Sequence, residues 1–360
     1  MGGTMSLLRS LLSRPRPVRH AAPPADEPSA SGLAPDDAVL LDVPDERLGP
    51  ALVAAARGDH APAAALMAAT RRSADWEARD RYALRFALFA RSRDSWLTRW
   101  LTQVPDDPDA LLLSAQLSVH RAWRSPARVE RLRELEPAIR TAAEAAPHDP
   151  VPWRLALDHA RGARTPHQVF AALWEQALRR SAHHYGCHLA ALTYLSARWY
   201  GSHRVCFDFA EQAALDARPD SPVQTLPLRA ALAQLTAGGP GTVAGARSDA
   251  AADRAAAFCA RRRPGDPAAA EARNTLAYVL VARGRWSAAL EQFRLTGPYA
   301  TSFPWSLGGG GDPLGRFLDA RELTRRAAAA EADAAPVLVP CTAGGAAVRG
   351  RAGRGGAVGH

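Results

Sequence analysis

Histidine and cysteine side chains gather in one short stretch of this chain of 360 residues, between positions 181 and 210. Their spacing gives two pairs of the form His-x2-Cys, His184 with Cys187 and His203 with Cys206, separated by 15 residues. Imidazole nitrogens and thiolates are zinc ligands, and two such pairs on adjacent antiparallel helices would supply four ligands of a tetrahedral site. A metal-dependent enzyme or metal-binding protein that uses the cluster at 183–206 is therefore one hypothesis.

The same stretch has a second interpretation without metal. A cysteine in an alanine-rich helix commonly serves as a small buried apolar residue, and a His-x2-Cys pair is less specific than Cys-x2-Cys. Ser202 then caps the helix that follows Gly201, and the imidazoles lie at a helix end or a groove edge. In this interpretation no metal ligand or cofactor is expected, and the rings line a binding pocket inside a curved fold. Its candidate binding residues are His184, His188, Trp199 and His203.

The chain contains no lysine, so all 45 basic residues counted as Lys or Arg are arginine. Chemistry that needs a lysine amine is therefore excluded, including Schiff-base formation and the lysine of a phosphate-binding loop. Arginine cannot replace it, because its guanidinium stays protonated. We recognise no catalytic motif, and we do not expect an enzyme.

The net charge of +9 is concentrated at the two ends of the chain. Residues 1–20 and 341–360 contain seven arginines and no acidic residue, so the rest of the chain is nearly neutral. A nucleic-acid-binding domain usually has a basic face on its folded body. Nucleic-acid or membrane-surface association through the basic tails is thus a weaker alternative, and nucleic acid is an unexpected partner.

Composition divides the chain into three parts. Residues 1–45 are basic and rich in proline, which predicts a disordered leader, and residues 335–360, rich in Gly and Arg, predict a disordered tail. Between them, residues 46–334 show apolar side chains at spacings of three and four, which indicates helices with one buried face. The predicted fold class is all-α.

A tetrapeptide of the form Pro-x-(Asp/Ser)-Pro recurs in the helical part. A proline ends the preceding helix, the Asp or Ser accepts from free amides of the next helix, and the second proline suits its first turn. The spacing of the four copies predicts a repeating pair of helices of about 36–45 residues. The copies begin at Pro105, Pro147, Pro219 and Pro264.

One helix pair resembles the tetratricopeptide repeat. Small residues would let its helices approach, larger side chains fill the seam, and a glycine allows the turn. The matching residues are Leu276, Ala277, Leu280, Gly284, Trp286, Ala289 and Phe293. Residues 51–70 show a weaker version, with His60 in place of the expected aromatic ring. A looser version with a longer turn surrounds Gly162, Phe170, Trp174 and Ala177.

The resemblance implies an irregular right-handed superhelix of antiparallel helix pairs, an α-solenoid, with a concave groove that binds a protein or peptide. Residues at groove-facing positions would include Glu271, Asn274 and Tyr278. The basic clamp by which some members of this family hold terminal carboxylates is not recognisable. A protein- or peptide-binding scaffold is therefore the leading hypothesis.

The segment Tyr194–His203 also resembles a joint found in uncharacterised bacterial helical-repeat proteins, of the form Tyr-Leu-x2-(basic)-Trp-x-Gly-Ser-His. That resemblance implies no known activity. No apolar run approaches the ~20 residues of a membrane span, and the opening residues contain too many arginines for a secretory signal. We therefore expect a cytoplasmic protein with reduced thiols.

Overall fold

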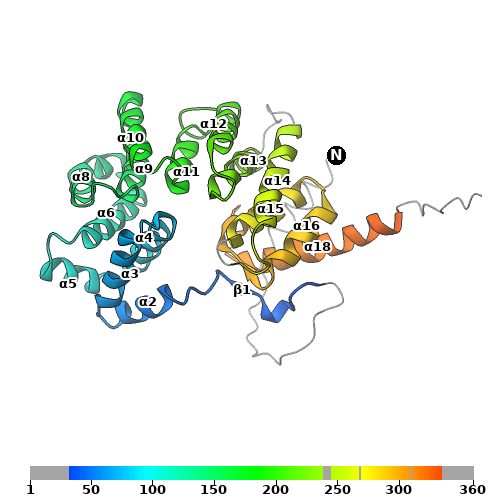
Figure 1. Ribbon diagram of the computed structural model, residues 1–360, viewed down its shortest axis with the longest axis horizontal. Coiled ribbons are helices and arrows are strands. Elements are labelled where there is room, and N and C mark those ends of the chain that lie inside the picture. Colours follow the sequence, from blue (N-terminus) through cyan, green and yellow to red (C-terminus); the bar gives the residue numbers. More distant parts are fainter. Residues whose placement is uncertain (1–31, 238–244, 267–268, 308, 310, 335–360) are drawn as a thin grey trace, which may run out of the picture.

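The computed structural model describes residues 32–237, 245–266, 269–307, 309 and 311–334. Within these residues the structure is almost entirely helical, which confirms the predicted all-α class (Figure 1). The elements are η1 (Asp36–Ala38), β1 (Leu40–Leu41), α2 (Leu48–Ala56), α3 (Ala61–Arg72), α4 (Trp76–Ala90), α5 (Ser95–Gln103), α6 (Pro108–Trp123), α7 (Arg128–Arg133), α8 (Glu136–Ala145), α9 (Val151–Ala163), α10 (His167–Arg180), α11 (Tyr185–Tyr194), α12 (His203–Asp216), η2 (Pro222–Thr225), α13 (Leu226–Ala237), α14 (Gly245–Ala260), α15 (Ala270–Ala282), α16 (Trp286–Thr296), β2 (Tyr299–Ala300), α17 (Ser302–Trp305) and α18 (Pro313–Ala334).

Three of the four proline tetrapeptides start helices as predicted. Asp107 accepts from the backbone amides of Asp109 and Ala110 at the start of α6. Asp149 accepts from the amide of the first residue of α9, and Ser221 does the same for the first turn of η2. The side chain replaces the missing intrahelical acceptor in each case. The fourth copy is only partly tested, because Pro267 lies outside the described residues.

The helices pack in an alternating order along the chain. One series, α4, α6, α9, α11, α13 and α15, has each member in contact with the next. The helices between them pack on this series, so that neighbours in sequence are also neighbours in space. Figure 1 shows the chain following a curve from α2 through α9 and α11 to α18, and α4 also contacts α11.

The helix pair expected from the repeat spacing is formed by α15 and α16. Gly284 lies in the turn between them with φ +70°, a conformation that strains other residues. Ala277 and Ala289 are fully buried where the helices approach, and Phe293 fills the seam. Small residues at the contact and a large one beside it thus reproduce the predicted packing.

The first helix pair, α2 and α3, follows the same pattern with one substitution. Gly58 has φ +85° in the turn, and Ala63 and Met67 are fully buried. His60 replaces the expected aromatic residue, and its ring stacks on the buried Trp100 of α5 with centroids 5.5 Å apart. An imidazole therefore serves as the aromatic contact here.

The pair α9–α10 departs from the pattern at its glycine. Gly162 lies inside α9, where an added Cβ would be 2.5 Å from Leu132 Cδ1 and 2.6 Å from Trp123 Cζ2. The residue with positive φ at the end of the helix is instead Arg164. Gly162 is thus required by close packing and not by a turn.

The leader expected at residues 1–45 differs from the structure in its last part. Leu33 and Val39 are buried in the core formed by α15, α16 and α18, and β1 pairs in parallel with β2. Asp42 accepts from the amide and hydroxyl of Ser302. Two buried apolar side chains and a strand contact hold this segment in place, although residues 1–45 as a whole are rich in proline. Residues 1–31 and 335–360, including both basic tails, lie outside the described residues.

No helix among the described residues is both long enough and apolar enough to traverse a bilayer.

Candidate functional site

The predicted cluster at 183–206 divides into parts that do not meet. His184 caps α11, because its Nδ1 accepts from the backbone amide of Cys187 at 3.3 Å and lies 3.1 Å from the Cys187 thiol. Both side chains are buried. Cys206 lies in a different apolar group, where its Sγ donates to the carbonyl of Leu195 at 3.3 Å.

These positions do not bring the four candidate ligands together. Among the residues that the structure describes, no group of three or more His, Cys, Asp or Glu side chains could hold a metal ion. His203 is the first residue of α12, and Ser202 caps that helix by accepting from the amide of Val205. The capping role predicted for Ser202 is therefore confirmed, whereas the four proposed ligands do not form one site.

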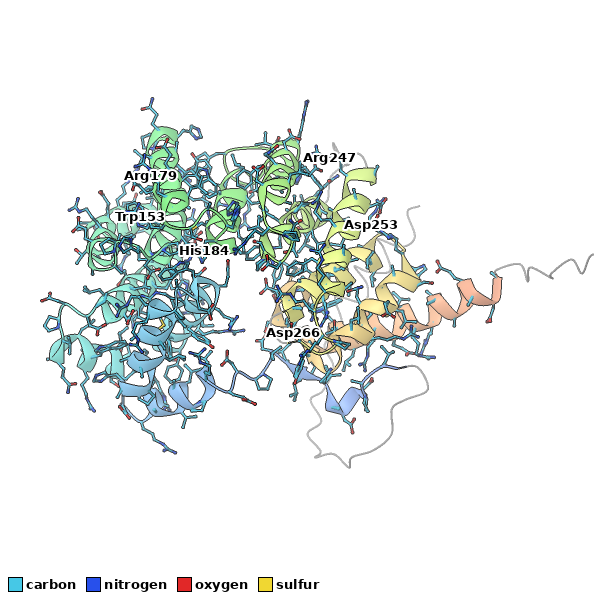
Figure 2. All side chains as sticks on the ribbon, in the orientation of Figure 1. Trp153, Arg179, His184, Arg247, Asp253 and Asp266 are labelled. Atoms are coloured by element: carbon cyan, nitrogen blue, oxygen red, sulfur yellow. The ribbon has the colours of Figure 1, made fainter. Side chains whose placement is uncertain are left out.

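His184 belongs to a buried polar network that the sequence analysis did not identify. Its Nε2 lies 3.9 Å from Asp80 Oδ2 of α4, and Asp80 pairs with Arg154 of α9 at 2.7 Å. Arg154 also donates to Gln116 of α6 at 2.6 Å. An added Cβ at Gly186 would be 2.1 Å from Asp80 Oδ2, so glycine permits this approach. Figure 2 shows His184 in the interior of the molecule.

The electrostatics of this network favour neutral forms of His184 and Cys187. Burial lowers the pKa of His184, and the positive charge of Arg154 lowers it further, against the opposing effect of Asp80. Burial also raises the pKa of the Cys187 thiol well above its ordinary value. A nucleophilic cysteine requires a thiolate and access for its substrate. The fully buried Cys187 has neither, so the Cys-His-Asp arrangement is structural.

Glu77, at the start of α4, joins this network to α11. Its Oε1 accepts from the backbone amide of Tyr185 at 2.8 Å. Burial raises the pKa of Glu77 to about 7, with the hydrogen bond from Tyr185 acting in the opposite direction. The contact between α4 and α11 therefore contains a carboxyl group that titrates near neutral pH.

A second buried network surrounds Arg79, the neighbour of Asp80. Arg79 is fully buried and pairs with Asp109 of α6 at 2.7 Å and with Asp149 at the start of α9. It also donates to the carbonyl of Met67 in α3. The acidic residues near the helix starts thus act as caps and as partners of a buried charge. An Arg-Asp dipeptide inside an amphipathic helix is the signal that could have indicated this role.

Two of the three groove-facing residues predicted on α15 are buried in the core. Asn274 is fully buried, donates to the carbonyl of Tyr299 and accepts from Trp305 Nε1 at 2.7 Å. Tyr278 is 7% exposed, and its ring contacts that of Trp305. Only Glu271 is exposed, where it pairs with Arg229 of α13 at 3.0 Å. The groove assignment of Asn274 and Tyr278 was wrong, because β2 and α17 cover that face of α15.

Of the remaining predicted binding residues, His188 and Trp199 make aromatic contacts. His188 is buried, and its ring lies 5.1 Å from that of Trp174. Trp199 is half-buried and meets Trp123 edge to face, with the guanidinium of Arg161 4.8 Å from its ring centre. Such contacts stabilise the joint between α11 and α12. None of these residues lines the groove described next.

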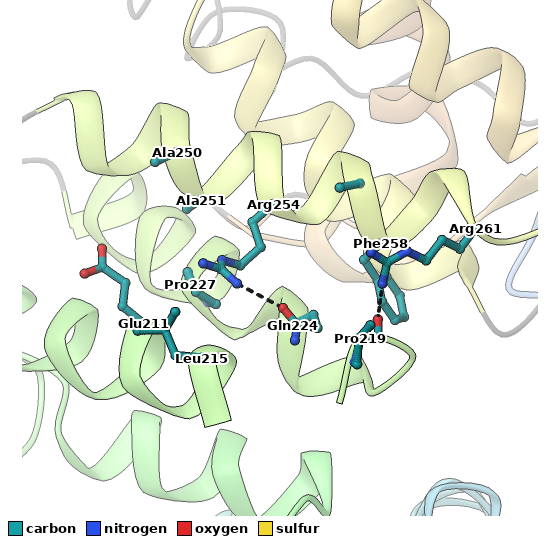
Figure 3. A pocket seen from close by; sticks show the side chains of 11 residues that line it. Glu211, Leu215, Pro219, Gln224, Pro227, Ala250, Ala251, Arg254, Phe258 and Arg261 are labelled. Carbon is teal, nitrogen blue, oxygen red and sulfur yellow. Dashed lines mark hydrogen bonds between the residues drawn. The ribbon is translucent and has the colours of Figure 1, made fainter. Parts of the chain in front are cut away.

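A groove lies between α12 and α14, above η2 and the start of α13 (Figure 3). It has a volume of about 480 Å³ and is open to solvent. Its surface is mainly apolar, and Glu211, Arg254 and Arg261 supply its charged groups. The full lining is Glu211, Leu215, Pro219, Gln224, Pro227, Ala250, Ala251, Arg254, Ala257, Phe258 and Arg261.

The amide of Gln224 fixes the geometry at the centre of the groove. Its Nε2 donates to the carbonyls of Ala214 and Ala217, which are at the end of α12 and would otherwise lack partners. Its Oε1 therefore faces α14 and accepts from Arg254 at 3.1 Å. No local motif marks this groove in the sequence, because its residues come from α12, the loop at Pro219, η2, α13 and α14.

Comparisons with known proteins give no family assignment. A scan against protein-family models, a search of curated proteins and a search of solved structures each found no match to this chain.

Proposed function

We propose that this protein is a protein- or peptide-binding helical repeat scaffold, an irregular right-handed superhelix similar to the tetratricopeptide repeat. The alternating contacts from α4 to α15 and the packing of α15 against α16 support this architecture. Helical repeats expose long surfaces between stacked helices, and partners bind along them.

The groove between α12 and α14 is the observation that carries this proposal. It combines an apolar surface with a few charged groups, which suits an amphipathic segment of another protein. Leu215 is 66% exposed at its edge, the largest fraction among the exposed large apolar side chains of the described residues. An exposed leucine beside a groove can add apolar area to a partner interface, although the fold of the free chain does not bury it.

Leu215→Asp tests the proposal. We expect the wild-type chain to retain a specific protein partner in co-purification from its native cell extract, and the variant to lose that partner. The fold should remain intact, because the side chain is exposed, and a circular-dichroism spectrum checks this.

Val53→Asp is the matched control. Val53 on α2 is 53% exposed and lies far along the chain from the groove, so this variant should retain the partner. Equal retention by wild type, Leu215→Asp and Val53→Asp would contradict the assignment of the groove as the binding surface.

We also propose a cytoplasmic location. Cys187, Cys206 and Cys259 are free and buried, which suits a reducing compartment. Cell fractionation with an antibody to the chain tests this, and recovery in a secreted or membrane fraction would contradict it.

A further inference from the structure

Three arginines recur at intervals of seven residues along the groove: Arg247 and Arg254 lie on α14, and Arg261 directly follows its last residue, Ala260. Seven residues are nearly two helical turns, so Arg247 and Arg254 lie in one row about 10 Å apart, and Arg261 follows at the end of the helix. Figure 3 shows Arg254 and Arg261 extending from α14 toward Gln224 and Pro219 on the opposite side of the groove.

Carboxylates of α12 already neutralise the first arginine of the row. Arg247 Nη2 lies 2.8 Å from Asp208 Oδ1 and 2.6 Å from Glu211 Oε2, and its Nε donates to the second oxygen of Glu211. Two acidic side chains thus neutralise Arg247, and one of them, Glu211, also lines the groove. The contact shows how a helix that lies beside α14 can satisfy an arginine of the row.

The second and third arginines have only neutral acceptors. Arg254 donates to Gln224 Oε1, and Arg261 donates to the carbonyl of Pro219 at 2.7 Å. Within the described part of the chain, neither guanidinium forms an ion pair with a carboxylate. Each retains donors that can bind a carboxylate from outside.

We propose that the groove binds an acidic amphipathic segment of a partner protein, whose carboxylates, about 10 Å apart, pair with Arg254 and Arg261. An apolar side chain of the segment lies between Leu215 and Phe258. This inference rests on the proposed function and specifies the chemistry of the partner.

The lining favours a carboxylate-bearing peptide over a nucleic acid. Single-stranded nucleic acids bind through exposed aromatic rings on which bases stack, together with a basic surface. Phe258, the aromatic residue of the groove, is 5% exposed, and the apolar part of the surface around it comes from alanine, proline and leucine side chains. An apolar peptide side chain suits this surface, whereas a phosphate backbone gains only the two charges.

The test uses the full chain and a labelled, alanine-rich peptide of about 16 residues, which is partly helical before it binds. The peptide carries two glutamates seven residues apart and a leucine between them. We expect saturable binding in fluorescence anisotropy, and at least ~10-fold weaker binding when both glutamates are replaced by glutamine.

Variants of the protein locate the contact. The double variant Arg254→Gln and Arg261→Gln should weaken binding of the glutamate peptide by ~10-fold or more and abolish its preference over the glutamine peptide. The matched control, Arg131→Gln with Arg133→Gln, removes the same charge from exposed positions on α7 and should leave binding unchanged. Circular dichroism confirms that each variant is folded.

A gain of binding sharpens the test. Asp208→Asn with Glu211→Gln frees Arg247, so a longer peptide with a third glutamate a further seven residues along should bind this variant more tightly than the wild type. No such gain is expected for the two-glutamate peptide.

Several outcomes would overturn the inference. They are equal binding of the glutamate and glutamine peptides, binding that does not depend on Arg254 and Arg261, or a preference for a single-stranded oligonucleotide of equal charge. If Leu215→Asp still abolished retention of the natural partner, the proposed function would stand and the acidic chemistry of the partner would fail alone.

Discussion

Arginine serves two different purposes in the network of α4, α6 and α9 and in the groove beside α14. Arg79 and Arg154, in α4 and α9, are buried and bind carboxylates from several helices at once. Along α14, Arg254 and Arg261 lie at the edge of a groove with neutral acceptors. Figure 2 shows His184, which belongs to the network of Arg154, inside the molecule, and Arg247 at its outer edge. Buried guanidiniums fix helices relative to one another, whereas exposed ones remain available to a partner.

The geometry of the side chain explains why arginine serves both purposes. A guanidinium has five donors in a planar fork, so Arg79 can bind a backbone carbonyl and two carboxylates simultaneously. In a chain without lysine, the burial of a charge and the number of its acidic partners distinguish structural from exposed arginines. Arginine content alone therefore gave no indication of function.

Arg79→Met should produce the largest effect. It leaves Asp149 buried without its arginine partner and Asp109 paired with Arg71 of α3 alone, and we expect a loss of about 3–5 kcal/mol in the free energy of unfolding. Urea denaturation followed by circular dichroism measures this loss. Adding Asp149→Asn should recover part of the stability, because the unpaired charge is removed.

A loss below about 1 kcal/mol in the free energy of unfolding of Arg79→Met would contradict the structural role assigned to the buried arginines. It would mean that the buried arginine contributes no more than an exposed one, and that the apolar contacts of the first half suffice to hold α4, α6 and α9.

Glu77→Gln should have an intermediate effect that depends on pH. The folded chain protonates Glu77 up to a pKa of about 7, compared with an ordinary value of 4.5. Between these two values the folded state binds more protons than the unfolded state, so the contribution of Glu77 to stability falls as pH rises. Glutamine stays neutral and can still accept from the amide of Tyr185. We therefore expect the variant to be more stable than wild type by about 1–3 kcal/mol at pH 8.

The difference between Glu77→Gln and wild type should disappear below about pH 4.5, where the carboxyl is protonated in both states. Burial lowers the pKa values of His184 and His188. Their effect on the free energy of unfolding is therefore opposite to that of Glu77, because they destabilise the folded protein as pH falls. Both proteins contain these histidines, so subtracting the wild-type free energy of unfolding from that of the variant at each pH isolates the contribution of Glu77. A difference that is constant with pH would show that the ionisation of Glu77 is not coupled to folding.

Local features of the fold could be predicted from the sequence, because their causes are local. Asp107 and Ser202 cap helices through amides a few residues away, and Gly284 adopts its turn next to the helices it joins. The segment around Asp42 could not be predicted in this way. Its partner, Ser302, is 260 residues distant, and proline-rich composition hid the buried Leu33 and Val39.

The site was less predictable than the fold. Repeat spacing places Asn274 and Tyr278 on one face of α15, but that face is free only if nothing later in the chain covers it. Trp305 does cover it, and its Nε1 donates to Asn274. The arginine row of α14 is visible in the sequence as a seven-residue interval, but its meaning depends on Gln224 and Pro219, which belong to other elements.

Among these variants, Arg283→Gln should have the smallest effect on the free energy of unfolding, because it removes an exposed arginine and not a buried one. Arg283 pairs with Asp249 of α14 through two contacts, at 2.8 and 3.1 Å, but both side chains are about one-third exposed. We expect a loss below about 1 kcal/mol in urea denaturation, and a smaller one at about 1 M salt, because salt screens exposed charges. The loss for Arg79→Met should barely change with salt, because that charge is buried. If Arg283→Gln instead cost as much as Arg79→Met, exposed arginines would also hold the second half together, and Arg254 and Arg261 could not be assumed available to a partner.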